Sequence, residues 1–344
     1  MNKQESAVLK GIAILFMLFL HLFHHPEEVN ALTNYIYIHD TPVTSYLVRL
    51  TDPVFLFLLI SGYGLYCAFQ TSRMSLKSNL LRAGKLYVHY WIVMTVFMLC
   101  SFLILGSAEL FGGFDDMILN ITGIDATYNF VGWFILPYCI AMIMSAVWCK
   151  ALRKWPRLTF GLALFGGYAV IVVIFKYIVP NNLYENNLIR NTVQALNFSC
   201  VMVVGAVFAH YKIIERFKSY FAERQFLLAI LLLAVLIGRM STTSAVFHRE
   251  YIFLFVPLVM SIRRPAIVTK VLASFGRRST TMWFCHTFFC YYIFRDFIYS
   301  FSHPVLIFLV LVALSYAVAV ILDPVVAKVR GFIFDSRLPA VEKA

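Results

Sequence analysis

The sequence predicts an all-α integral membrane protein with about ten transmembrane helices and both termini in the cytoplasm. Of the 344 residues 61% are hydrophobic and only 13% are charged, and the mean hydropathy is +0.80. Soluble domains are about 45–50% apolar and about 25% charged, so this composition excludes a soluble globular enzyme and a disordered chain. The arrangement of apolar stretches and of cationic residues supports the same fold class.

Ten apolar stretches provide the expected spans. Most approach the roughly 20 residues that a helix needs to cross a bilayer. They lie at about residues 8–24, 46–67, 87–106, 129–149, 158–179, 193–210, 226–238, 251–262, 281–299 and 304–322. The seventh and eighth are shorter, so they are expected to be short tilted helices or a re-entrant pair; we favour ten spans over eight.

The cationic residues then fix the orientation. With a cytoplasmic N-terminus and alternating spans, 23 of the 29 Lys and Arg residues fall on the cytoplasmic side and six on the outside. This asymmetry follows the positive-inside rule and explains the net charge of +12 without a nucleic-acid partner. We expect one transmembrane domain over residues 1–344, with the first span retained and no appended soluble domain.

Two ionisable residues of the first span share one helix face. Lys10 and His21 are eleven residues apart, which brings them 20° past three full turns and about 16 Å apart along the axis. An ionisable residue within a span usually faces a cavity and indicates a functional site. The alternatives are that Lys10 extends to the inner headgroups, or that His21 binds metal with His24 and His25. No second Cys or His cluster completes a metal site, so none is expected.

Polar residues at four other spans are further candidates. The second span ends Ser61-Gly62, which indicates either close helix packing or a substrate contact. Arg82, Lys85 and His89 give the start of the third span a basic face that suits a polyanion, or that only follows the positive-inside rule. Trp133 opens the fourth span and could be an interfacial residue. His286 is a second intramembrane histidine, expected nearer the inner face.

Five motifs in this order resemble the integral-membrane acyltransferase 3 family, which includes bacterial surface-polysaccharide O-acetyltransferases. The resemblance covers nearly the whole chain, although the family usually has Arg where Lys10 and Lys85 stand. The motifs are Lys10-Gly11-Ile12-Ala13 with His21, Phe55 to Ser61-Gly62-Tyr63, Arg82-Ala83-Gly84-Lys85 followed by aromatics, Trp133-Phe134, and Gly276-Arg277-Arg278-Ser279 followed by His286.

The resemblance implies a multi-pass acyltransferase of the bacterial inner membrane that takes part in polysaccharide biosynthesis by O-acetylation. It implies acyl-CoA, most simply acetyl-CoA, as co-substrate, no bound cofactor, and a glycan or lipid-linked saccharide as acceptor. His21 and His286 would be catalytic, with His21 as the base. Lys10, Arg82 and Lys85 would bind the donor's phosphates, and Ser61, Gly62 and Trp133 would also contact substrate.

A polytopic transporter or flippase for a polysaccharide or lipid-linked sugar is the alternative. Such proteins also need buried polar residues and interrupted helices. However, no matched pair of Gly- or Pro-interrupted spans is visible in the two halves of the sequence.

Overall fold

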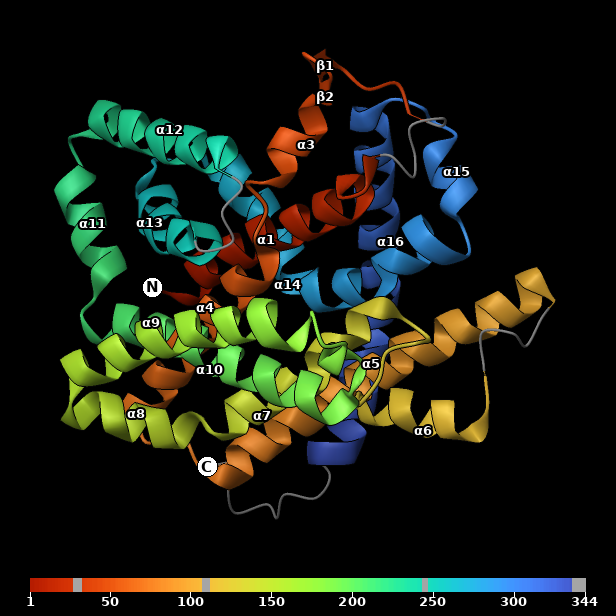
Figure 1. Ribbon diagram of the computed structural model, residues 1–344, viewed down its shortest axis with the longest axis horizontal. Helices are drawn as coiled ribbons and strands as arrows, with labels where there is room; N and C mark the ends of the chain where they lie inside the picture. The colour runs from red at the N-terminus through yellow and green to blue at the C-terminus, as the bar shows by residue number, and fades with distance from the viewer. Residues whose placement is uncertain (27–32, 107–111, 243–246, 336–344) are drawn as a thin grey trace.

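The computed structural model describes residues 1–26, 33–106, 112–242 and 247–335, and it is almost entirely helical (Figure 1). The first half comprises α1 (Lys3–Phe23), β1 (Tyr37–Ile38), β2 (Thr41–Pro42), α3 (Val43–Val48), α4 (Pro53–Gln70), α5 (Leu76–Leu105), α6 (Phe114–Thr122), the 3-10 turn η2 (Phe130–Phe134), α7 (Ile135–Ile143), α8 (Ser145–Lys154), α9 (Pro156–Val173) and the π-helical turn η3 (Ile174–Ile178). The second half comprises η4 (Leu183–Glu185), α10 (Asn187–His210), α11 (Ile213–Phe221), α12 (Gln225–Ser241), α13 (Phe247–Ser261), α14 (Ala266–Thr287), the π-helical turn η5 (Phe288–Tyr292), α15 (Arg295–Tyr299), α16 (Pro304–Arg330) and η6 (Gly331–Asp335).

This architecture confirms the all-α membrane class, since 82% of the described residues are helical. Each of the ten predicted apolar stretches lies mostly on helix, but ten crossings are not confirmed. Six helical segments within the described residues are long and apolar enough to span a bilayer, and a seventh results if one bent pair is counted as a span. They are α1, α3 with α4, α5, α9 with η3, α10 and α16 with η6; the bent pair is η2–α7 and α8.

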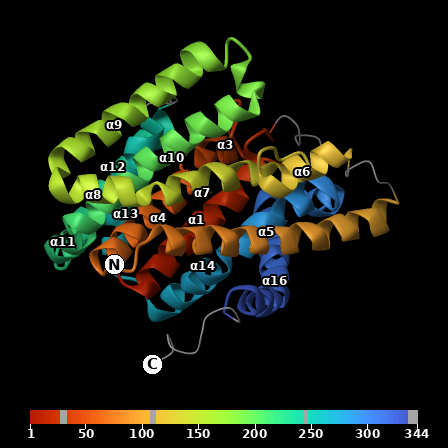
Figure 2. The ribbon, with the colours of Figure 1, turned by 90° about the horizontal axis from the view of Figure 1, so that it is seen from below.

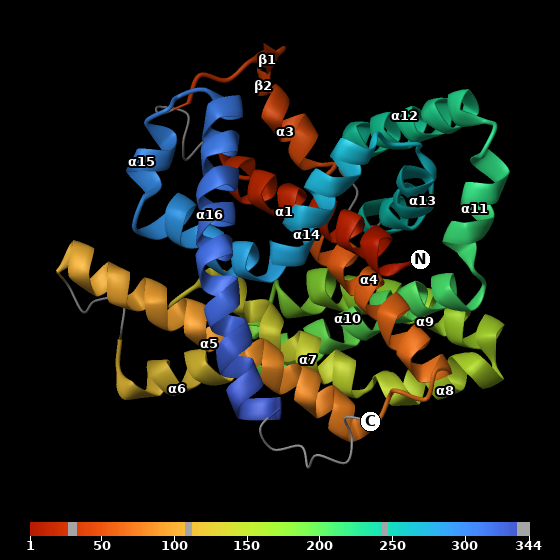
Figure 3. The same ribbon diagram turned by 180° about the vertical axis from the view of Figure 1, so that it is seen from behind.

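Glycines set the closest helix contacts. A methyl group at Gly11 of α1 would collide with the Leu272 carbonyl of α14, and one at Gly276 of α14 would collide with the Ala7 carbonyl of α1. Small residues allow backbones to approach this closely within a membrane. The two helices lie side by side at the centre of the molecule, with α16 against α14 (Figure 3).

A second glycine contact joins α4 to α10. Gly62 lies against the Met202 carbonyl, and Gly205 lies against the Leu59 carbonyl. Figure 2 shows α10 between α4 and α9, with α9 at the edge of the molecule. The centre of the protein is therefore built from two helix pairs, α1 with α14 and α4 with α10.

The predicted fourth span, 129–149, is a bent segment and not one straight helix. The axes on either side of its break differ by 46°. The buried Asn79 amide of α5 donates to the Met142 carbonyl at 3.1 Å and to Ser145 Oγ at 3.0 Å, so polar groups at the break keep their hydrogen bonds. An interrupted helix is tolerated at membrane depth where protein groups satisfy its backbone.

Candidate functional site

Two histidines meet where α1 and α14 approach their C-terminal ends. His21 Nδ1 lies 2.7 Å from His286 Nε2, and the side chain of His286 is completely buried. The glycine contacts between α1 and α14 make this meeting possible, because they hold the two helix axes close together. The sequence predicts His286 nearer the inner face from its place early in the stretch 281–299, and the structure places it beside His21. Helix α14 begins at Ala266, so His286 lies in its last turn.

The hydrogen bonds of the pair determine which ring nitrogens carry protons. His286 Nδ1 lies 2.6 Å from the Trp283 carbonyl oxygen, which can only accept, so this nitrogen donates. In the neutral ring His286 Nε2 is then an acceptor, and His21 Nδ1 must donate to it. The lone pair of His21 is therefore on Nε2, and that atom is the one able to act as a base.

His21 lines a cavity of about 930 Å³, formed where α1, η2, α10 and η5 end or begin. We call it the outer cavity, after the side that the orientation predicted from the cations gives it. Trp133 lines this same cavity, so the structure groups it with His21 and not with the basic residues. The ring of Tyr291 packs edge-on against the His21 ring, with centroids 5.8 Å apart, and its hydroxyl donates to the His21 carbonyl at 2.8 Å. These contacts limit the orientations open to the His21 ring.

A second cavity, of about 460 Å³, lies beside the N-terminal half of α1, and we call it the inner cavity after its predicted side. The structure brings Lys10, Ser61, Arg82 and Lys85 together in its lining, although they come from three separate helices. Arg330 of α16 adds a fourth cation, and the lining includes no Asp or Glu. Cations that share one cavity lining without an acidic residue in that lining attract a polyanion, because low-dielectric walls strengthen their field.

Neighbouring groups position the polar side chains of the inner cavity. Arg82 Nη1 donates to Asn79 Oδ1 at 2.7 Å, which ties it to the break between α7 and α8. The Lys85 ammonium lies 5.8 Å from the centroid of the Phe334 ring. Ser61 Oγ lies 3.1 Å from the Tyr138 hydroxyl, so Ser61 is not bonded only to its own helix.

Gly62 does not line the inner cavity. Its backbone packs on α10 at Met202, which is the helix-packing alternative for this glycine. Gly64, one position beyond Tyr63, does line the cavity, and nothing lies within 4 Å of the place where its Cβ would stand. The open position in the second span is therefore Gly64 and not Gly62.

Sequence reasoning missed a buried chain of hydrogen bonds behind the inner cavity. Thr281 Oγ1 donates to Asp323 Oδ1 at 2.5 Å, so it accepts from His89 Nε2, 2.6 Å away. His89 lines the cavity, while Thr281 and Asp323 come from α14 and α16. Asp323 near the end of an apolar run was the available signal, because a carboxylate there is rarely without a function or a partner.

No group of three or more His, Cys, Asp or Glu residues in the described ranges has the geometry of a metal site. His24 and His25 line the outer cavity with His21, but the close partner of the His21 ring nitrogen is His286.

Fold and site together define a polytopic helical membrane protein with a histidine pair at one cavity and a cluster of cations at another. The family model described as an acyltransferase domain, that of the acyltransferase 3 family, matches residues 5–323. The chain belongs to this family and is a membrane acyltransferase. Comparison with curated proteins and with solved structures gives no significant match.

Proposed function

We propose that this protein moves an acetyl group from cytosolic acetyl-CoA to a hydroxyl of a cell-surface glycan, or of its lipid-linked precursor, in a bacterial inner membrane. One observation carries the proposal: a single helix, α1, places Lys10 in the basic inner cavity and His21 in the outer cavity. The inner cavity suits the anionic head of a donor with a long arm. In the outer cavity His21 is placed to act as a base on a hydroxyl.

The inner cavity would bind the phosphates of the donor. Its four cations and the absence of acidic groups in its lining match the phosphates of coenzyme A. Arg82 is the best-positioned of them because Asn79 holds its guanidinium. A guanidinium binds phosphate oxygens in pairs, whereas the two lysines contribute point charges.

The distance along α1 suits the donor's shape. Lys10 and His21 are eleven residues apart, or about 16 Å of helix. The pantetheine arm of the donor would extend along this helix and bring its thioester to His21. The reaction then occurs away from the cytosolic water that would hydrolyse the acetyl group.

His21 Nε2 is the reacting atom. In direct transfer it removes the proton of the acceptor hydroxyl, the oxygen bonds to the thioester carbonyl carbon, and the carbon–sulfur bond breaks. The departing thiolate then takes the proton from His21, so charge and protons balance. In an acyl-histidine route the same nitrogen bonds to the acetyl carbon first. His286 stabilises the protonated ring in direct transfer, because its Nε2 accepts the His21 Nδ1 proton.

Purified protein in lipid nanodiscs with acetyl-labelled acetyl-CoA tests this proposal. We expect the wild type to transfer or hydrolyse the label, and His21→Gln to lose about 10²- to 10⁴-fold in rate, the usual share of a general base. His303→Asn is the matched control: His303 is exposed at the N-cap of α16, and Asn keeps a capping group. Full activity of His21→Gln would remove His21 from catalysis, and an intact label with the wild type would favour a transporter.

A further inference from the structure

We propose that the outer cavity is an acceptor site for an uncharged sugar ring, in which Arg190 and Asp125 bind neighbouring hydroxyls. The inference rests on the proposed acyl transfer and names the substrate class for it. Arg190 opens α10 and Asp125 lies in the segment before η2; both line the outer cavity together with His21. Neither residue stood out in the sequence.

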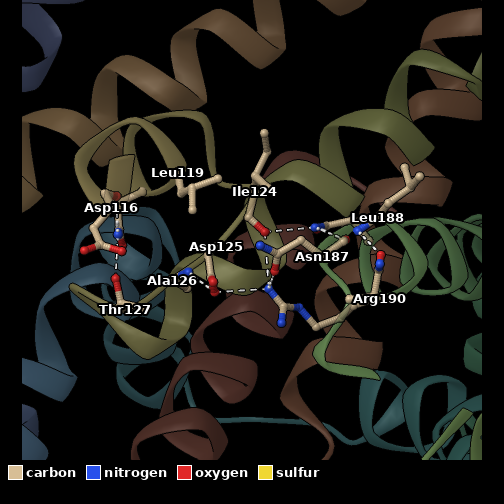
Figure 4. Close-up of polar contacts among 12 residues, drawn as sticks. Asp116, Leu119, Ile124, Asp125, Ala126, Thr127, Asn187, Leu188 and Arg190 are labelled. Carbon is tan, nitrogen blue, oxygen red and sulfur yellow. Dashed lines mark hydrogen bonds and ion pairs between the residues drawn. The ribbon is translucent and has the colours of Figure 1, made fainter. Parts of the chain in front are cut away.

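Hydrogen bonds to neighbouring backbone and side-chain groups hold the Arg190–Asp125 pair in place. Arg190 Nη2 donates to Asp125 Oδ1 at 3.1 Å, to Asn187 Oδ1 at 2.5 Å and to the Ile124 carbonyl at 3.3 Å (Figure 4). The Asn191 amide donates to the same carbonyl at 2.9 Å. The start of α10 therefore fixes the segment that carries Asp125, and the pair has one defined geometry before any ligand arrives.

The pair still has hydrogen-bonding capacity for a ligand. The three acceptors of the Arg190 guanidinium share the two hydrogens of Nη2, and within the described residues Nη1 and Nε have no partner. Asp125 Oδ1 accepts from Arg190 and from the Ala126 N–H, which leaves Oδ2 without a partner in the same described residues. Donors beside an acceptor match two adjacent hydroxyls, since each hydroxyl can both donate and accept.

Charge favours a neutral ligand over an anionic one. Asp125 neutralises Arg190, and Arg295, the other arginine in the lining of this cavity, lies 3.6 Å from Asp296. Asp125 would also repel a carboxylate or a phosphate brought close to it. The contrast with the inner cavity is clear, because four cations line that cavity without an acidic residue. The two cavities are thus suited to different chemistry, a polyanion in the inner cavity and a polyol in the outer cavity.

Aromatic rings form the remaining wall, as in many sites that combine apolar surface with a few polar groups. Trp133 and Trp283 line the cavity, and Phe134 packs edge-on against both, with centroids 6.1 and 4.4 Å away. Phe57 also stacks on Trp283, with centroids 5.7 Å apart. The indoles are therefore held in place and can cover the apolar face of a sugar ring.

The 3-10 turn η2, which carries Trp133, connects this sugar site to His21, the proposed base. Phe130 of η2 packs edge-on against the His21 ring at 6.3 Å, and Asn129 before it donates to the Phe284 carbonyl of α14 at 2.8 Å. Arg190 and Asp125 would hold two hydroxyls of the ring, while a different hydroxyl reaches His21 Nε2. The pair would then determine which hydroxyl is acetylated.

Binding is tested without donor, by titrating the protein's tryptophan fluorescence in nanodiscs. The probes are methyl α-D-glucopyranoside and its anionic counterpart, methyl α-D-glucopyranosiduronic acid. We expect saturable quenching by the glucoside and binding of the uronate that is weaker by about tenfold, one hydrogen bond to a charged group. Arg190→Gln should weaken glucoside binding about tenfold, whereas Asp125→Asn should weaken the glucoside and strengthen the uronate. Lys176→Gln, an exposed outer cation outside the cavity lining, is the matched control.

The opposite response of the two probes to Asp125→Asn is what a purely structural role would not produce. Equal binding of both probes, unchanged glucoside binding in Arg190→Gln, or no saturable quenching by either probe would overturn the acceptor site. Acetyl transfer to the glucoside is measured separately. Binding as expected with no use of acetyl-CoA would reject the acyl-transfer proposal and keep the sugar site, so the two failures are distinguishable.

Discussion

At the residue scale, His286 is proposed to act only through His21. His286→Phe keeps a buried ring but removes the acceptor for His21 Nδ1, so we expect kcat to fall about 10²-fold with an unchanged donor KM. His286→Gln should keep more activity, because its amide can still donate to the Trp283 carbonyl and accept from His21. Steady-state kinetics of both variants decide the point. Equal losses of kcat in His286→Phe and His286→Gln would contradict a hydrogen-bonding role and indicate that His286 matters only for packing.

Lys10 is expected to bind the donor and not only to orient α1. Lys10→Gln should raise the donor KM about tenfold or more, the loss of one contact to a charged group, while Lys10→Arg should keep or improve donor affinity. Lys3→Gln is the control, since Lys3 lies on the same helix, is exposed and does not line the inner cavity. Donor titrations measure these changes. Unchanged donor affinity in Lys10→Gln would favour the alternative that Lys10 only extends to the inner lipid headgroups.

The sequence indicated much of the site but not its partners. Lys10 and His21 could be paired because helix periodicity relates residues on one element. His21 contacts His286, and Arg330 shares a cavity lining with Lys10. Both relations join residues hundreds of positions apart and depend on how helices pack. Arg190 gave no signal at all, because an arginine on the outside of a membrane protein is ordinary until its carboxylate partner is known.

At the element scale, α4 offers a way to fill the inner cavity without damaging the fold. Gly64 has open space where a side chain would project, and so does Gly161 of α9, which lines neither cavity. Gly64→Leu should therefore raise the donor KM by about tenfold or more while Gly161→Leu leaves it unchanged. Thermal unfolding in detergent should be similar for both. A loss of stability specific to Gly64→Leu, with normal donor affinity in the folded fraction, would contradict this assignment.

Helix existence was predictable from apolar runs, but helix continuity was not. The stretch 281–299 reads as one span, yet it contains the end of α14, the π-helical turn η5 and the short α15. The stretch 129–149 bends by 46° because Asn79, on another helix, can satisfy groups at the break. Hydropathy measures the preference of a segment for lipid and contains no information on such tertiary hydrogen bonds.

At the scale of the whole molecule, the orientation inferred from the cations places the inner cavity in the cytosol. In a cysteine-free background, Ser75→Cys before α5 should react with an impermeant maleimide only in inverted vesicles. Asn181→Cys before α10 should react in intact cells, since both positions are exposed in the structure. The reverse pattern would bring the donor cavity to the outside, where acetyl-CoA is not available, and would contradict the proposed function.

The span number shows where whole-molecule prediction stops. Charge asymmetry constrains the sides on which the loops lie, and it is satisfied by ten or by eight crossings. The structure gives six helices long enough to cross, or seven with the bent pair, within its described ranges. Helix α12, of 17 residues, is shorter than the usual span and packs with α11 and α13. Short helices of this kind can lie in a thinned or protein-lined region, which composition does not reveal.

The glycine contacts have a consequence for motion. Where backbone meets backbone, no flexible side chain can yield, so α1 with α14 and α4 with α10 should each move as a rigid pair. Any opening that admits a substrate must then occur between the pairs, where the contact is made by rings such as Phe57 on Trp283. Sliding of stacked rings needs far less rearrangement than separating interlocked backbones. The histidine pair would thus keep its geometry throughout a catalytic cycle while the path to it widens and narrows.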